Sequence, residues 1–102
     1  MNDTIRPVVT RDDIIGFCRR HHILKLSLFG SYLREDFRSD SDIDVLVLFE
    51  PGITIGFRIF DMENELSGLF GGRKVDIVNE KFLNHRLRDR ILASSEVQYE
   101  ER

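Results

Sequence analysis

The stretch Ile43–Phe49, with the sequence Ile-Asp-Val-Leu-Val-Leu-Phe, is the feature that most restricts how this chain can fold. It is almost continuously apolar and rich in β-branched and aliphatic residues, which is typical of a strand buried on both faces. The turn residues Glu50-Pro51-Gly52 follow it directly. Such a strand lies inside a sheet with other elements packed above and below it, so the sequence predicts a layered fold.

Periodic patterns elsewhere predict the elements around this strand. In chain order they are a helix over about residues 10–22, a strand at Ile23–Phe29, a helical turn after it, the central strand, a helix over about 54–70, a strand at Val75–Val78, a helix marked by Leu83, Leu87 and Ile91, and an edge strand at Val97–Tyr99. This order predicts an α+β fold, an α/β sandwich in which helices flank a small mixed β-sheet. We expect residues 1–9 to form an N-terminal lead-in and residues 10–102 a single domain.

The pattern assigns one group of apolar residues to a common strand face and another group to the core. Alternation along the first strand places three leucines on one face: Leu24, Leu26 and Leu28. Three phenylalanines are assigned to the core, although exposed members of the group would indicate a partner surface: Phe57, Phe60 and Phe70.

The composition disfavours several classes of function. Lys and Arg number 15 against 18 Asp and Glu, a net charge of -3, whereas general nucleic-acid binders usually carry a basic excess. The single cysteine, Cys18, excludes an internal disulfide and a multi-cysteine zinc site, and it is expected to be a small buried apolar residue. The start Met1-Asn2-Asp3-Thr4 lacks the basic-then-apolar order of a secretory signal, and the apolar runs are too short to span a bilayer. The expected compartment is therefore the cytoplasm.

Two acidic residues, Asp42 and Asp44, stand where the central strand begins. Residues two apart on a strand share a face, so both carboxylates are expected to emerge together. Two carboxylates about 5 Å apart repel by about 3 kcal/mol at an effective dielectric constant near 20, and a hard divalent cation such as Mg²⁺ removes that penalty. A third acid, Asp76, interrupts the strand Val75–Val78 in the same way and reaches the same site if the two strands are neighbours.

Gly30-Ser31 lies at the end of an apolar strand and before a predicted helical turn. Such a junction presents backbone N–H groups and the positive end of a helix dipole to an anion. Glycine lets a phosphate approach the backbone, and Ser31 offers a hydroxyl. Arg34, one turn later, adds a guanidinium group that can bind a phosphate through two N–H groups. The sequence therefore predicts a phosphate-binding loop near the acidic pair.

These motifs together resemble a known family. Gly30-Ser31, followed after ten residues by Asp42-Ile43-Asp44, is similar to the G-S-x10-D-x-D signature of the DNA polymerase β-like nucleotidyltransferase superfamily. The chain looks like the minimal nucleotidyltransferase (MNT) branch, small domains that serve as antitoxins to HEPN-domain ribonucleases. The resemblance covers most of residues 10–95, and it departs from many relatives at Glu35-Asp36-Phe37, where they have glycine and small residues. It runs through Phe29–Phe37, Ser41–Val47, Phe49–Gly52, Gly72–Val78 and Arg88–Leu92.

The resemblance implies a polymerase β-like nucleotidyltransferase fold and a role for each matched residue. Asp42 and Asp44 match the metal-binding pair and Asp76 the third carboxylate, which in the superfamily hold two Mg²⁺ ions. Gly30 and Ser31 match the pair that grips the phosphates. The implied activity is transfer of AMP from ATP to a tyrosine hydroxyl of a cognate HEPN RNase toxin, with which a hetero-oligomer is expected. No membrane partner and no strong general nucleic-acid binding are expected.

Two other functions remain open from the sequence. The chain could neutralise a toxin by tight binding without catalysis, although all three acids of a nucleotidyltransferase site are present. It could also be a nucleotidyltransferase acting on RNA ends or a small metabolite, which the small size and the acidic charge balance disfavour.

Overall fold

A computed structural model describes residues 10–29 and 42–101. In these residues the elements follow the order α1 (Arg11–Arg20), β1 (Ile23–Phe29), β2 (Ile43–Phe49), α2 (Arg58–Leu69), β3 (Val75–Asn79), the short 3-10 helix η2 (Glu80–Phe82), α3 (His85–Ser94) and β4 (Glu96–Glu100). The strands form one sheet in the order β3-β2-β1-β4, in which β2 and β3 are parallel and the other neighbours antiparallel. The predicted mixed sheet, with Ile43–Phe49 as an inner strand, is confirmed.

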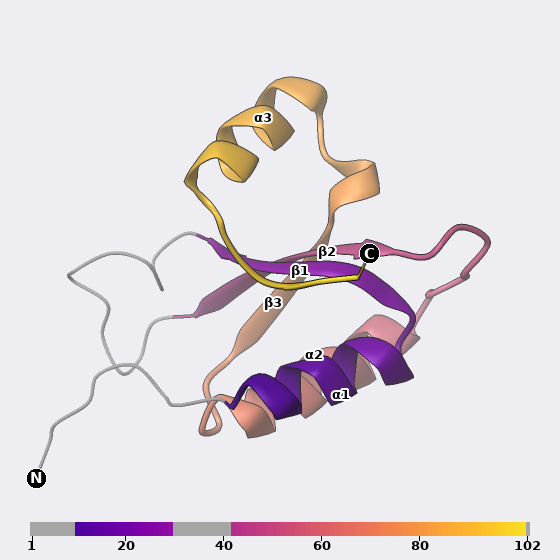
Figure 1. The fold of residues 1–102 in the computed structure, drawn as a ribbon, viewed down its shortest axis with the longest axis vertical. Coiled ribbons are helices and arrows are strands. Elements are labelled where there is room, and N and C mark those ends of the chain that lie inside the picture. Colours follow the sequence, from indigo (N-terminus) through magenta and orange to yellow (C-terminus); the bar gives the residue numbers. More distant parts are fainter. Residues whose placement is uncertain (1–9, 30–41, 102) are drawn as a thin grey trace, which may run out of the picture.

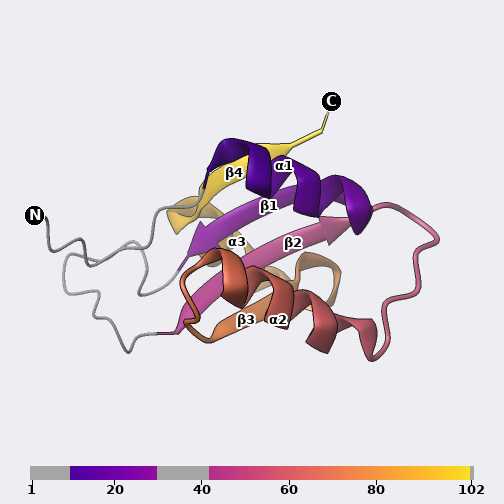
Figure 2. The ribbon, with the colours of Figure 1, turned by 90° about the horizontal axis from the view of Figure 1, so that it is seen from below.

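The sheet has a helix layer on each face. Helices α1 and α2 lie together against one face and α3 lies on the opposite side (Figure 1, Figure 2). The core fills the space between the sheet and the α1–α2 layer, where alternate residues of β2, Ile43, Val45 and Val47, are fully buried with Phe17 and Leu66. This alternation follows from the pleat of a strand, which sends every second side chain to the same face.

The α3 face is covered less completely. Leu46, which belongs to the other face of β2, is 1% exposed, so the prediction of a strand covered on both faces is confirmed there. None of the residues of α3 is buried, however, and Leu87 in its apolar stripe is 47% exposed. Among the residues described, no helix is long and apolar enough to cross a membrane.

The helix ends follow from local sequence. The Thr10 hydroxyl accepts a hydrogen bond from the Asp13 amide at 3.1 Å and caps α1. Helix α2 begins at Arg58, later than the predicted residue 54, because Gly56 adopts a positive φ of 52° in the preceding turn. At the other end of α2, the Gly72 amide donates to the Ser67 carbonyl at 2.7 Å with φ of 87°, which is a typical glycine stop.

Two predictions about the core are corrected. The pairing of β1 with β2 shifts register between Ile23 and Lys25, so Ile23 joins Leu26 and Leu28 in the core and Leu24 does not. Phe57 and Phe60 are 87% and 58% exposed and stack on each other at the start of α2, instead of packing inside. Phe70 and Cys18 are buried as predicted.

A polar contact joins the two helices of the α1–α2 layer. His21, at the end of α1, has its Nε2 2.8 Å from Glu65 Oε1 of α2, and Arg20 forms an ion pair with the same carboxylate. The His21 ring also lies 4.7 Å from the Phe17 ring. These contacts hold α2 against α1, and none of them involves a strand.

Candidate active site

Two of the predicted acids face each other across neighbouring strands. In the parallel pairing of β2 with β3, Asp44 is the direct partner of Asp76, and Val45 is the partner of Ile77. Neighbouring strands are about 4.8 Å apart, and paired residues project from the same face. The core-side positions are Ile43, Val45 and Ile77, so both carboxylates lie on the opposite face, which is the α3 side of the sheet. The condition under which Asp76 was expected to reach the same site, that the two strands are neighbours, is therefore met.

Asp42 lies immediately before β2, at the edge where both parallel strands begin. The Ile43 amide donates to the Lys74 carbonyl at 2.9 Å, which brings the start of β2 beside the residue that precedes β3. The Lys74 ammonium lies 4.0 Å from the Asp42 carboxylate, and both side chains are exposed. In this arrangement Asp42 has a cationic neighbour as well as the two acids.

The electrostatics connect the three carboxylates. The pKa of Asp44 is raised, first by burial and then by the negative charges of Asp76 and Asp42. Phe29 contributes to this burial, because it is the cross-strand partner of Asp44 on β1. A carboxylate that is partly removed from water and faces two like charges is destabilised in its charged form, and an added cation removes that cost.

The chemistry of this donor set fits magnesium, which prefers carboxylate oxygens and is commonly bound by one or two carboxylates together with substrate phosphates. Among residues 10–29 and 42–101, however, no three His, Cys, Asp or Glu side chains are placed close enough to enclose an ion. The predicted phosphate-binding residues Gly30, Ser31 and Arg34 lie outside the described residues.

Comparison with known proteins supplies the family. The profile described as Polymerase beta, Nucleotidyltransferase matches residues 12–102 of the chain. The chain belongs to this nucleotidyltransferase family. A relative from Methanocaldococcus jannaschii, provisionally named a protein adenylyltransferase, is 34% identical over 79 residues, which cover 78% of this chain and 83% of that protein. The protein adenylyltransferase MntA of Thermococcus cleftensis is 34% identical over 73 residues, which cover 72% of each protein.

Solved structures of nucleotidyltransferases share the fold. A structure provisionally described as a minimal nucleotidyltransferase is 39% identical to this chain, with a TM-score of 0.70 over 83% of this chain and 85% of that one. A complex of an MNT antitoxin with a tri-AMPylated HEPN toxin of Shewanella oneidensis matches with a TM-score of 0.65 over 88% of this chain and 69% of that one. Its sequence identity is 21%, so this match establishes the fold alone. The nucleotidyltransferase fold predicted from the motifs is confirmed.

Sequence reasoning missed two residues of this nucleotidyltransferase that contact an acid or the strand that carries one. Lys74 is adjacent to Asp42, and Glu63 of α2 accepts a hydrogen bond from the Ile77 amide, next to Asp76 in β3. Lys74 could have been noticed, because it directly precedes the strand that contains Asp76. The sequence holds no signal for Glu63, since one acid among several on a helix does not indicate which strand it reaches.

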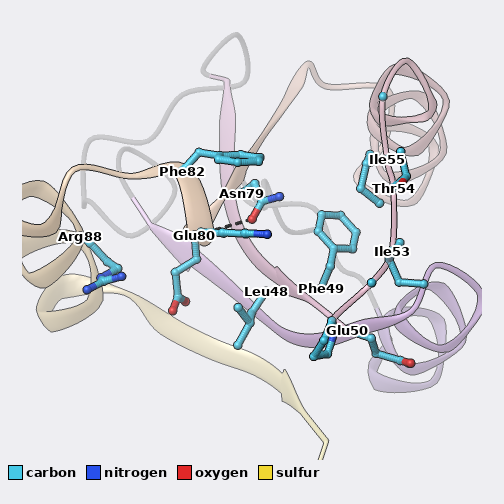
Figure 3. A pocket seen from close by; sticks show the side chains of 14 residues that line it. Leu48, Phe49, Glu50, Ile53, Thr54, Ile55, Asn79, Glu80, Phe82 and Arg88 are labelled. Atoms are coloured by element: carbon cyan, nitrogen blue, oxygen red, sulfur yellow. Dashed lines mark hydrogen bonds between the residues drawn. The ribbon is translucent and has the colours of Figure 1, made fainter.

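A hollow of about 690 Å³ lies at the other end of β2 (Figure 3). Its walls include Leu48 and Phe49 at the end of β2, Ile55 in the following loop, Asn79 at the end of β3 and Phe82 in η2. None of the predicted site residues within the described part of the chain lines it. Because a strand advances about 3.3 Å per residue, this hollow is more than about 10 Å from Asp44 along β2.

Proposed function

We propose that this chain is an antitoxin protein adenylyltransferase, which uses two magnesium ions to transfer AMP from ATP to a tyrosine hydroxyl of a cognate HEPN RNase toxin. The observation that carries the proposal is the pairing of Asp44 with Asp76 on one face of the sheet, with a raised pKa at Asp44 that Asp42 and Asp76 help to cause. Three acids that repel one another at a sheet end are suited to holding cations, which in turn bind the phosphates of a nucleotide.

Each residue of the site has a proposed role. Asp42 and Asp44 hold magnesium together with Asp76, while Gly30 and Ser31 bind the triphosphate and Arg34 adds a positive charge to it. Bound magnesium stabilises the charge on the entering and departing oxygens of the displacement at phosphorus. The carboxylate of Asp76 accepts the proton of the tyrosine hydroxyl.

The bonds in the proposed reaction balance. The tyrosine oxygen forms a bond to the α-phosphorus of ATP, and the bond from that phosphorus to the oxygen bridging to the β-phosphate breaks. Pyrophosphate leaves with the electron pair, and AMP remains on the toxin. The reaction consumes ATP, so the cytoplasm expected from the sequence is the proposed compartment.

The relatives support a protein acceptor. Two relatives at 34% identity carry the name protein adenylyltransferase, one of them provisionally. A structure with the same fold is an MNT antitoxin in complex with a tri-AMPylated HEPN toxin. We extend the acceptor class of these proteins to this chain as part of the proposal.

The test is to incubate the purified protein and its HEPN partner with ATP and Mg²⁺ and to weigh the partner by mass spectrometry. The partner should gain the mass of one or more AMP groups on a tyrosine and lose its RNase activity. The double variant Asp42→Asn/Asp44→Asn should transfer AMP at least about 100-fold more slowly, since it removes two carboxylates proposed to hold the magnesium that stabilises the reacting charges. The control Asp61→Asn, at an exposed position of α2, should transfer AMP at the normal rate.

Neutralisation by binding alone is the second candidate, and the exposed Phe57–Phe60 pair favours it because such a pair is suited to a protein partner. The same double variant separates the two functions. If it still silences the toxin without adding AMP, binding is sufficient; if protection disappears while the complex still forms, the chemistry is required.

A further inference from the structure

The position of Asp76 depends on a strand that has a neighbour on one side only in the described sheet. Strand β3 stands at the end of the order β3-β2-β1-β4 and pairs with β2 alone. In the observed register Asp76 faces its partner Asp44, while Val75 and Ile77 are buried in the core. A slip by one residue would turn Asp76 toward the core, because successive side chains point to opposite faces.

Helix α2 supplies a second support for β3. The Ile77 amide donates a hydrogen bond to Glu63 Oε2 at 2.8 Å, in a partly buried position. The helix that carries Glu63 is itself fixed, since Met62 and Leu66 on either side of this position are fully buried in the core. A backbone group on the free side of β3, one residue after Asp76, is therefore tied to a rigid helix.

We propose that Glu63 is a positioning residue for AMP transfer, which holds β3 through the Ile77 amide so that Asp76 stays opposite Asp44. The expected effect on the rate of AMP transfer rests on the proposed function. The expected effect on the position of Asp76 rests on the fold alone. Glu63 acts through the backbone beside Asp76 and has no assigned contact with ATP or with the acceptor.

The same helix offers a matched control. Glu65 is two residues along α2 and is also a glutamate with hydrogen-bonded partners, but those partners are His21 and Arg20 of the α1 end. Removing Glu65 loosens the packing of α2 on α1 and leaves the Glu63–Ile77 hydrogen bond in place. A general loss of stability in α2 and a specific loss at β3 can therefore be told apart.

The experiment compares Glu63→Ala, Glu63→Gln and Glu65→Ala by steady-state AMP transfer and by amide hydrogen exchange at Ile77. Glu63→Ala should lower kcat about tenfold, the factor expected for one lost hydrogen bond to a charged group, with KM for ATP within about twofold. Glu63→Gln keeps a carbonyl acceptor, so it should restore kcat to within about threefold of the original protein. Glu65→Ala should lower Tm while kcat and the protection of the Ile77 amide stay unchanged.

Binding of Mg²⁺ in the presence of ATP, measured by calorimetry, gives a readout independent of turnover. Glu63→Ala should weaken it about tenfold and Glu65→Ala should leave it unchanged. The inference is overturned if Glu63→Ala keeps normal kcat and Mg²⁺ affinity while the Ile77 amide loses protection, or if Glu63→Ala and Glu65→Ala lower kcat equally. If the unaltered protein transfers no AMP, the proposed function fails, and the exchange and Mg²⁺ measurements still decide whether Glu63 holds the site.

Discussion

Replacing Asp44 with asparagine should raise the stability of the metal-free protein, although it removes a native side chain. Asp44 and Asp76 are direct partners on neighbouring strands, so their carboxylates are about 5 Å apart, and at an effective dielectric constant near 20 they repel by about 3 kcal/mol. Both side chains retain contact with solvent, which screens part of this energy, and we expect about 1 kcal/mol to be released. For a domain of this size that corresponds to a rise in Tm of about 4–8 °C.

The gain should depend on pH in a defined direction. Burial, and then the charges of Asp76 and Asp42, raise the pKa of Asp44 in the folded protein above its value in the unfolded chain. Ionising Asp44 therefore costs stability as the pH rises through the raised pKa, and asparagine escapes this cost. Below about pH 3, well under the ordinary aspartate pKa, Asp44 is neutral in both states, so the difference between Asp44→Asn and the original protein should vanish there.

The assay is urea denaturation with EDTA present, over a series of pH values, repeated with Mg²⁺ and ATP in place of EDTA. Ligand should stabilise the original protein more than Asp44→Asn, because the variant lacks one carboxylate for the cation. Asp61→Asn, in the first turn of α2, is the control. It should lower the free energy of unfolding by about 0.3–1 kcal/mol, because it removes a negative charge that interacts favourably with the helix dipole. A clear loss of stability in metal-free Asp44→Asn at pH 7 would refute the repulsion argument and assign Asp44 a structural role.

Two further predictions concern the core and the surface. Burial raises the pKa of the Cys18 thiol to about 12. Iodoacetamide at pH 8 should therefore leave Cys18 unmodified in the folded protein and alkylate it completely in urea. Rapid labelling without urea would contradict its burial. Phe70→Ala should destabilise the protein by about 3–5 kcal/mol in urea denaturation, whereas Phe57→Ala, at an 87% exposed position, should change it by less than about 0.5 kcal/mol. Equal losses in the two variants would show that Phe57 is packed.

Local rules were sufficient for most of the framework. The helices predicted over about residues 10–22 and 54–70 are both present, and their ends are set locally: Thr10 caps α1 and Gly71-Gly72 follows the end of α2, because caps and glycine stops depend on residues close in sequence. The almost continuously apolar run at Ile43–Phe49 predicted a central strand, since such a sequence is typical of a strand covered on both faces.

Where local rules failed, tertiary contacts decided the outcome. The register shift between Ile23 and Lys25 exchanges Leu24 for Ile23 in the core, and no alternation pattern within β1 reveals it. Phe57 was assigned to the core because of its size and apolarity, but the turn at Gly56 starts α2 one residue after it and leaves its ring in solvent. The hydrogen bond from Ile77 to Glu63 likewise requires α2 to be docked on the sheet, which only long-range packing determines.

The three acids of the candidate site could be identified from the sequence by their charge and position. Asp42, Asp44 and Asp76 were identified from sequence because charged residues beside buried strands are costly and require a reason. In the structure the contact between Asp42 and Lys74 joins two exposed groups at 4.0 Å, and such pairs contribute about 0–1 kcal/mol. The repulsion between Asp44 and Asp76, about 1 kcal/mol after screening, is of similar size, and a divalent cation bound to both carboxylates would offset it. The negative charges of Asp76 and Asp42 both act on Asp44, so a divalent cation bound among the three acids would offset the cost of ionising Asp44.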